Sequence, residues 1–414
     1  MQTALVILLA LLSLAGAACA VYFGVVIRRV LLVLARTPRL RDGLTETAEG
    51  VGPPTVCVIV PAHNEARVIE KAVHSILAQD YAALRVVFAL DRCTDDTRAI
   101  VERAGAGDPR VEIVEIDACP AGWAGKTHAL REGVARSRAA ESTDVLLFLD
   151  ADTEMSPACV RAAVGLMRAR GVDLVSLLGE LTRDRWYERV VQPMTSVELM
   201  RQHPLYRVNR ERDRTSFANG QFLLFRKAAY EALGGHARVK DALLEDLAFA
   251  RALKADGRPW VVALAGPMLR CRMYGSWEAF GRGWRRIFIE SARRRPDRLR
   301  RYGRRVRLAY TALPVAALAA LVTGAIGVAG DTGAVARVGV VAGSIGLGVW
   351  LLAMTLALRA QGAGIGAALL TPIGAWLTGG VLAEAARDLE ENRGLVWGGR
   401  VYTDLTPGSS TPDD

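Results

Sequence analysis

Two aspartates lie close together after a strongly apolar run. Asp150 and Asp152 follow the run 145–149 and are separated by one alanine. Side chains two positions apart in an extended segment point the same way, so both carboxylates should share one face at the end of a buried strand. There they would repel each other and be costly to desolvate. A divalent cation such as Mg²⁺ or Mn²⁺ resolves that cost, because such ions bind a few carboxylates together with phosphate oxygens. The alternative is two solvated acids in a turn.

A second acid pair, Glu245 and Asp246, opens the helical stretch that continues from Leu247. One of these carboxylates could act as a general base, accepting a proton from an acceptor hydroxyl while the hydroxyl oxygen attacks. The alternative is structural, because the helix dipole favours acids in the first turn.

Polar residues also follow the apolar run 55–60, in a segment that begins with Pro61 and ends with Asn64 and Glu65. The Asn-Glu pair can bond a ribose or a base, and the N-terminus of the following helix favours anions. The alternative is that Asn64 caps that helix and that Glu65 lies in its first turn.

Two more clusters complete the set. Asp91 follows the run 84–90 and could accept a hydrogen bond from a base N–H. Lys126 follows Gly125 and could reach a diphosphate, with a solvated surface lysine as the alternative. The full phosphate-loop pattern is missing because position 120 is proline, so the sequence does not indicate an ATPase.

The scaffold for these clusters is predicted from six short runs rich in β-branched residues, which alternate with helical patterns. The predicted strands are 55–60, 84–90, 111–116, 145–149, 172–178 and 259–264. Such alternation predicts a mostly parallel sheet covered by helices on both faces. Ligands of these sheets bind at the carboxyl ends of strands, where every cluster falls.

Composition narrows the class of partner. The chain has 414 residues, 51% of them apolar, and a formal net charge of +10. Such a charge could indicate a nucleic-acid binder, but the aromatic residues do not interleave with the basic ones. The densest basic run instead abuts a hydrophobic segment, so we expect an anionic membrane surface as partner and no nucleic acid. The six cysteines have no metal-ligand spacing and are expected to be reduced.

Apolar runs near both ends predict membrane spans. Residues 4–27 carry no charge and are followed by an arginine-rich segment, which places the next domain in the cytoplasm by the positive-inside rule. A signal peptide is the alternative for this run. Residues 308–329 and 338–358 are two further candidate spans, and 363–385 is a weaker one that proline and glycines interrupt.

Taken together, the five clusters resemble the family 2 glycosyltransferases with the GT-A fold. The resemblance covers about residues 55–290, and the segments 220–226 and 232–235 add to it. The membrane arrangement is similar to that of transferases acting on carotenoid, hopanoid or other lipid acceptors, and the tail 397–402 looks like the end of such proteins. The resemblance implies an α/β, Rossmann-like catalytic domain with N-terminal and C-terminal transmembrane helices, in a bacterial inner membrane.

The resemblance also implies roles for individual residues. Asp246 would be the general base, with Glu245 as its neighbour, in an inverting transfer from a UDP- or GDP-sugar to a membrane lipid. Asp150 and Asp152 would hold Mg²⁺ or Mn²⁺ and, through it, the diphosphate. The implied donor-binding residues are Pro61, Asn64, Glu65, Asp91, Lys126 and Asp150.

One departure from the family pattern bears on the product. Processive members carry Gln-x-x-Arg-Trp, whereas the matching stretch 280–286 keeps only Trp284. This favours transfer of a single sugar over a processive polysaccharide synthase. A non-catalytic scaffold is the other alternative, but it would be expected to have lost acids that are all present here. Gln221, Trp284 and Arg285 are expected on the acceptor or membrane side, with an interfacial anchor as the alternative for Trp284.

The arginine-rich stretch 282–307 interleaves with aromatic residues and predicts an in-plane helix on anionic lipid. The sequence therefore divides into an anchor, a linker, a catalytic domain, a basic interfacial segment, C-terminal spans and a tail. Their bounds are 1–34, 35–54, 55–270, 271–306, 307–385 and 386–414.

Overall fold

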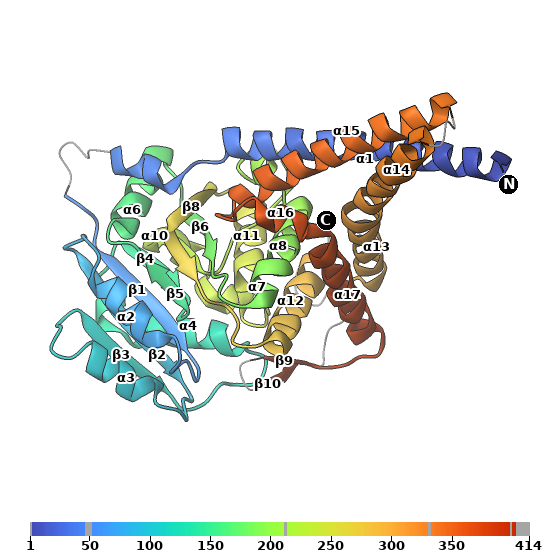
Figure 1. The fold of residues 1–414 in the computed structure, drawn as a ribbon. Helices are drawn as coiled ribbons and strands as arrows, with labels where there is room; N and C mark the ends of the chain where they lie inside the picture. Colours follow the sequence, from blue (N-terminus) through green and yellow to red (C-terminus); the bar gives the residue numbers. More distant parts are fainter. Residues whose placement is uncertain (1, 46–51, 211–212, 330–332, 398–399, 403–414) are drawn as a thin grey trace. The chain divides into compact units, whose positions relative to one another are not determined.

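The computed structural model describes residues 2–45, 52–210, 213–329, 333–397 and 400–402 (Figure 1). The chain forms two compact units, each built from separate stretches of sequence. The helical unit comprises 1–36, 183–202 and 294–393, and the α/β unit comprises 37–182, 203–293 and 394–414.

The α/β unit is built on an eight-stranded sheet with the order β3-β2-β1-β4-β7-β6-β8-β5. In that order the strands are Val111–Ile116, Leu84–Asp91, Val56–Ala62, Val145–Leu149, Phe222–Arg226, Leu174–Leu181, Trp260–Cys271 and Thr153–Met155. All six predicted strands are present. The predictions lacked β5 and β7, and β7 runs antiparallel between β4 and β6. The sheet is therefore mixed, although most of its pairs are parallel, as predicted.

Helices cover both faces of this sheet. Side chains alternate between the two faces along each strand, so each strand contributes to two cores. Val58 and Val60 of β1 belong to one core cluster, whereas Cys57 and Ile59 belong to the other. The first cluster packs against α2 (Ile69–Leu77), α3 (Thr97–Ala104) and α6 (Cys159–Arg170). The second packs against α4 (Gly125–Arg136), α5 (Arg138–Glu141), α10 (Lys227–Ala232) and α11 (Glu245–Ala255).

A pair of glycines fixes the segment that leads into the sheet. The 3-10 helix η1 (Leu40–Thr45) lies against α6, and a Cβ at Gly165 would lie 2.0 Å from the carbonyl oxygen of Gly43. No side chain fits at that distance, so the backbones of η1 and α6 require glycine at this crossing.

We therefore predict different effects of two Gly→Ala substitutions within helices. Gly165→Ala should lower the free energy of unfolding by about 1–3 kcal/mol through overpacking. Gly281→Ala, in α12 (Trp277–Ser291), meets nothing within 4 Å and should be neutral or slightly stabilising, since alanine is the better helix former. Thermal melting of both variants in detergent checks this; equal melting temperatures would contradict the close contact.

The helical unit contains the apolar helices. Three described helical stretches are long and apolar enough to cross a membrane: Thr3–Arg36, Pro296–Ala329 and Gly333–Arg359. They contain the predicted runs 4–27, 308–329 and 338–358. The stretch 296–329 is continuous through α13 (Pro296–Arg307), a π-helical turn (Leu308–Ala312) and α14 (Leu313–Ala329).

Small residues bring these helices together. A Cβ at Gly343 of α15 (Gly333–Arg359) would lie 2.6 Å from the carbonyl oxygen of Ala317, and one at Gly346 would lie 2.6 Å from that of Gly16 in α1 (Gln2–Arg36). Such close approach is typical of helices that pack in lipid.

The weaker candidate span 363–385 is not among the described helices that are long and apolar enough to cross. It is divided into α16 (Gly366–Leu369) and α17 (Thr371–Glu390), and the break falls just before Pro372. Proline is favoured in the first turn of a helix, which is why α17 begins there. α17 packs against α13 and α8 (Gln192–Gln202) within the helical unit, which also contains α7 (Trp186–Val190).

The basic segment 271–306 is divided between the two units at Arg293. Its aromatic face lies on α12, where Phe280, Trp284 and Phe288 are buried. The prediction of a lipid-facing in-plane helix is therefore wrong for this face, because protein atoms cover it. The rest of the α/β unit comprises α9 (Leu205–Val208), η2 (Gly235–Val239) and a hairpin of β9 (Leu395–Trp397) and β10 (Arg400–Tyr402).

Candidate active site

The carboxyl ends of neighbouring parallel strands bring the polar clusters together, as the sequence predicts. β1 pairs with β2 on one side and with β4 on the other, all in parallel. Asp91 ends β2, and Asp150 follows the last residue of β4. This edge of the sheet holds the candidate site.

Lys126 links the two acid pairs. Its Nζ lies 2.6 Å from Asp150 Oδ1 and 2.6 Å from Glu245 Oε1. Lys126 is only 16% exposed, so the solvated surface lysine considered from the sequence is not what the structure contains. Burial alone would lower the pKa of Lys126, but the charges of Asp150 and Glu245 raise it above its ordinary value. The lysine is thus a fixed cation between carboxylates from two different elements.

The environments of Glu245 and Asp246 push their pKa values apart. Burial tends to raise the pKa of Glu245, but the adjacent Lys126 outweighs it and lowers that pKa. Burial and the charge of Glu245 raise the pKa of Asp246 to about 7. One acid is therefore held ionised while its neighbour titrates near neutral pH, the range that suits a general base.

Two backbone N–H groups orient the Asp246 carboxylate. Gly220 N donates to Oδ2 and Leu247 N donates to Oδ1, each at 2.7 Å. A Cβ at Gly220 would lie 3.1 Å from Glu245 Oε1 and 3.3 Å from Lys126 Nζ, so only glycine leaves this contact unstrained. Gly220 was not predicted as a site residue, although its place at the start of the 220–226 motif was the available signal.

Asp152 and Glu65 add further carboxylates. Asp152 Oδ1 accepts from Cys271 Sγ at 3.1 Å, and burial together with Asp150 raises the pKa of Asp152 to about 7. Burial, then Asp152 and Asp150, raise the pKa of Glu65 to about 8. Glu65, predicted to hold the nucleoside, therefore lies within electrostatic range of the two aspartates predicted to hold metal.

Asp150 and Asp152 carry oxygens that suit a divalent cation. Within the described part of the chain, no group of three or more His, Cys, Asp or Glu side chains could hold a metal ion. Mg²⁺-type ions are commonly bound by one or two carboxylates plus substrate phosphates, which is the donor set that Asp150 and Asp152 offer. Burial raises the pKa of both acids, and Lys126, which is in contact with Asp150, offsets only part of that effect.

Asn64 joins two loops and does not cap the next helix. Its Oδ1 accepts from Thr94 N at 2.8 Å and from Thr94 Oγ1 at 3.3 Å. Its φ of 57° lies in the left-handed region, which asparagine tolerates better than most residues. α2 begins only at Ile69, after Val68 as its N-cap residue, so the capping interpretation is wrong. Pro61 lies within β1, opposite Ala89 of β2.

The Asp91 carboxylate accepts hydrogen bonds from the next residue, Arg92. Arg92 donates from Nε to Oδ1 at 2.9 Å and from Nη2 to Oδ2 at 2.7 Å, a bidentate pair. A Cβ at Gly125, the first residue of α4, would lie 3.5 Å from Arg92 Nη2. The N-terminus of α4 therefore lies beside the Asp91–Arg92 pair, and Arg92 is a site residue that the sequence did not single out.

The predicted acceptor-side residues have different environments. Gln221 is buried, and its carbonyl oxygen accepts from Asp150 N at 3.3 Å, so it does lie beside the acids. Trp284 is 2% exposed and packs between Phe280 and Phe288, so it is not an interfacial anchor. Arg285 is half-buried on the same helix.

Arg286, the next residue on α12, was not predicted. Its Nη1 donates to the carbonyl oxygen of Leu243 at 2.8 Å. Burial raises the pKa of Asp150, whereas Lys126 and, less strongly, Arg286 lower it. The charge of Arg286 therefore reaches Asp150.

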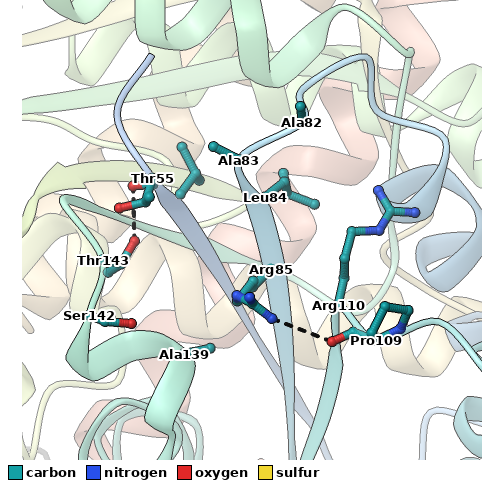
Figure 2. A pocket seen from close by; sticks show the side chains of 11 residues that line it. Thr55, Ala82, Ala83, Leu84, Arg85, Pro109, Arg110, Ala139, Ser142 and Thr143 are labelled. Carbon is teal, nitrogen blue, oxygen red and sulfur yellow. Dashed lines mark hydrogen bonds between the residues drawn. The ribbon is translucent and has the colours of Figure 1, made fainter. Parts of the chain in front are cut away.

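A hollow elsewhere on the α/β unit is not this site. A cavity of about 270 Å³ is lined by Thr55, Leu84, Arg85 and Thr143, and Figure 2 shows these residues around it. These residues stand at the amino ends of β1, β2 and β4, opposite the strand ends that carry the acids. Arg85 Nη1 donates to the carbonyl oxygen of Pro109 beside it, at 3.5 Å.

Comparisons with known proteins agree with this architecture. The family model described as "Glycosyltransferase like family 2" matches residues 53–293. A 4,4'-diaponeurosporenoate glycosyltransferase of Staphylococcus aureus (strain MRSA252) is 26% identical over 230 residues, 55% of this chain and 59% of the relative. The chain thus matches less than two thirds of the length of that relative.

Two solved structures are also similar. A mannosyltransferase from Pyrobaculum calidifontis in complex with GDP-Man and Mn²⁺ is 19% identical, with 92% of this chain and 99% of that chain covered and a TM-score of 0.44. Glucosyl-3-phosphoglycerate synthase from Mycobacterium tuberculosis, in complex with Mn²⁺, UDP and phosphoglyceric acid, is 20% identical, with 61% and 82% covered and a TM-score of 0.39. The α/β unit has the mostly parallel, mixed sheet of the GT-A fold. Because the family model spans more than half of the sequence, the chain belongs to the glycosyltransferase like family 2.

Proposed function

We propose that this protein transfers a single sugar from a UDP- or GDP-sugar to a hydroxyl or carboxyl group of a membrane lipid, with inversion at the anomeric carbon. The observation that carries the proposal is the acid pair on α11. Lys126 holds Glu245 ionised, and Asp246 is oriented by two backbone N–H groups with its pKa near 7. A solvated acid pair in a helix turn would have neither feature.

The donor would bind across the carboxyl ends of β1, β2 and β4. Lys126 offers positive charge for the diphosphate, close to the positive end of the α4 dipole. Asp91 and Arg92 offer acceptor and donor groups for the nucleoside. Asp150 and Asp152 would hold Mg²⁺ or Mn²⁺, which when bound offsets the charge that develops on the departing nucleoside diphosphate.

The proton transfer from the acceptor requires only a residue of this chain. Asp246 accepts the proton of the acceptor O–H as the acceptor oxygen bonds to the anomeric carbon. The bond from that carbon to the diphosphate oxygen breaks, and the nucleoside diphosphate leaves with its electron pair. One displacement from the opposite face inverts the configuration. An acceptor carboxylate would react without this proton transfer, so dependence on Asp246 distinguishes the two acceptor chemistries.

A lipid acceptor is supported by the helices that could span a membrane and by the name of the Staphylococcus aureus relative, a diaponeurosporenoate glycosyltransferase. We further propose a bacterial inner membrane with the α/β unit in the cytoplasm, from the arginines that follow the apolar run 4–27, and an anionic membrane surface as partner. A processive synthase is the second candidate, although the stretch 280–286 lacks the glutamine and the arginine of the processive motif.

The direct test is nucleotide release by purified protein in detergent with native lipid extract, across a panel of UDP- and GDP-sugars with Mn²⁺ or Mg²⁺. We expect release that depends on the lipid, from one donor, and that is lost with chelator. Mass spectrometry should show one sugar added per lipid, and longer chains would favour the processive alternative. Folded protein that releases nucleotide from no donor would contradict the proposal.

A further inference from the structure

The C-terminal hairpin belongs to the α/β unit, although the helical unit separates it from that unit in sequence. The chain leaves the α/β unit after Arg293 and returns to it only at Gly394. β9 and β10 then pair antiparallel, with Tyr402 opposite Leu395, and Leu395 is buried. β9 lies against α12, the helix that carries Arg286. The hairpin is therefore anchored on an element of the candidate site.

Tyr402 reaches the other side of that site. Its hydroxyl accepts a hydrogen bond from Gly125 N, the first amide of α4, at 3.2 Å. A Cβ at Gly125 would lie 3.5 Å from Arg92 Nη2 and 3.6 Å from Asp91 Oδ2. The phenol is therefore held next to the pair that ends β2, and it lies within electrostatic range of the Arg92 guanidinium.

The hydroxyl of Tyr402 is engaged by Gly125 N, and the residue as a whole is only half-buried. A flat ring held at its hydroxyl end suits the face of a nucleobase, because every base offers a π-face for stacking. A tyrosine fixed in this way loses little further rotational freedom when a ligand binds.

We propose that the C-terminal hairpin completes the nucleoside end of the donor site, with Tyr402 as the wall on which the base stacks. This rests on the proposed function, because it assumes a nucleotide-sugar donor. Tyr402 is thus a donor-binding residue, and it takes no part in proton transfer. Its contribution should act on the nucleoside and spare the diphosphate, which binds at Lys126.

The experiment measures inhibition constants in the full-length protein in detergent, with the donor that supports turnover. The inhibitors are the matching nucleoside diphosphate, UDP or GDP, and inorganic pyrophosphate. Tyr402→Ala should raise the inhibition constant of the nucleoside diphosphate by about tenfold or more, as loss of one base–aromatic stack implies. The constant for pyrophosphate should stay within about twofold, and kcat at saturating donor should change little, because uniform binding energy affects KM and not kcat.

Tyr402→Phe keeps the ring and removes only the hydrogen bond to Gly125. It should therefore raise the inhibition constant of the nucleoside diphosphate by a few-fold, which is about the value of one exposed hydrogen bond. Tyr402→Leu replaces Tyr402→Ala should the latter not fold, since it keeps apolar bulk without an aromatic face. The proposal is overturned if a folded Ala or Leu variant binds the nucleoside diphosphate as wild type does. It is equally overturned if the inhibition constant of pyrophosphate rises as much as that of the nucleoside diphosphate.

The wild-type protein separates this inference from the proposed function. If wild type is inhibited by neither nucleoside diphosphate and turns over no donor, the proposed function fails. If wild type binds its nucleotide and the Tyr402 variants bind it equally well, only the inference about the hairpin fails. A lower melting temperature with an unchanged ratio of the two inhibition constants would indicate that the hairpin is purely structural.

Discussion

Replacing Asp246 with Asn should reduce sugar transfer to a hydroxyl acceptor by about 10²–10⁴-fold in kcat, the usual value of a positioned general base. The amide is nearly isosteric, and its oxygen can still accept from Gly220 N or Leu247 N. Folding and donor binding should therefore survive. Steady-state kinetics and calorimetry with the donor check the two parts of this expectation, and turnover within a few-fold of wild type would refute the assignment of the base.

A matched control lies at the other end of the same helix. Asp256 follows the last residue of α11 and pairs with Arg238 away from the acids. Asp256→Asn makes the same chemical change on the same element, and kcat should stay within about twofold, as is usual for substitutions at surface ion pairs.

The pH profile gives a second readout for Asp246. Burial and Glu245 raise its pKa to about 7, so the protonated form, which cannot accept a proton, predominates below that pH. We therefore expect kcat to rise with pH towards 7 and to level off above it. In Asp246→Asn the residual rate should lose this rise. A wild-type rate that falls as pH increases from 5.5 to 7 would contradict this role.

The positions of the acids were predictable because they depend on strand ends. An apolar run such as 145–149 indicates a buried strand whatever surrounds it, and the residue that follows must emerge at the edge of the sheet. The order of parallel strands then places Asp91 and Asp150 at the same edge. The runs did not predict that β7 lies antiparallel between β4 and β6. The direction in which a strand pairs depends on connections that are distant in sequence.

The links between the clusters were not predictable, because they depend on tertiary distances. Lys126 lies 24 positions before Asp150 and 119 before Glu245, and only the packing of α4 and α11 on one face of the sheet lets one ammonium reach both. The bond from Gly125 to Tyr402 spans 277 positions and depends on the chain returning from the helical unit. No local pattern signals such contacts.

The prediction that the aromatic face of α12 lies on lipid was wrong for a different physical reason. Aromatic residues at spacings of three and four produce an apolar helix face, and that pattern is the same whether lipid or protein covers the face. The neighbouring arginines favoured lipid in the prediction. The structure instead buries Phe280, Trp284 and Phe288.

Replacing Asp150 with Asn should abolish metal-dependent transfer and the effect of Mn²⁺ on nucleotide binding. Asp150 is the predicted metal ligand that also pairs with Lys126, so the substitution removes the negative charge that would face the cation and that faces Lys126. We expect kcat/KM to fall by about 10²–10³-fold, the range seen when a key electrostatic group is lost. The binding readout is independent of turnover: in wild type, UDP or GDP with Mn²⁺ should raise the melting temperature more than the nucleotide with chelator.

In Asp150→Asn the difference in melting temperature between Mn²⁺ and chelator should vanish. Retained stabilisation by Mn²⁺ would contradict the assignment of Asp150 as a metal ligand. Asp144 supplies the matched control, because it precedes the opposite end of β4 and its Oδ2 accepts from Thr55 N at 2.8 Å. Asp144→Asn should lower stability slightly but leave the Mn²⁺ response intact. If both variants lost the response, the cause would be general disturbance of β4, and the carboxylate of Asp150 would have no specific role with the metal. If only Asp150→Asn loses it, the cation belongs at the carboxyl end of β4, where the donor diphosphate can complete its coordination.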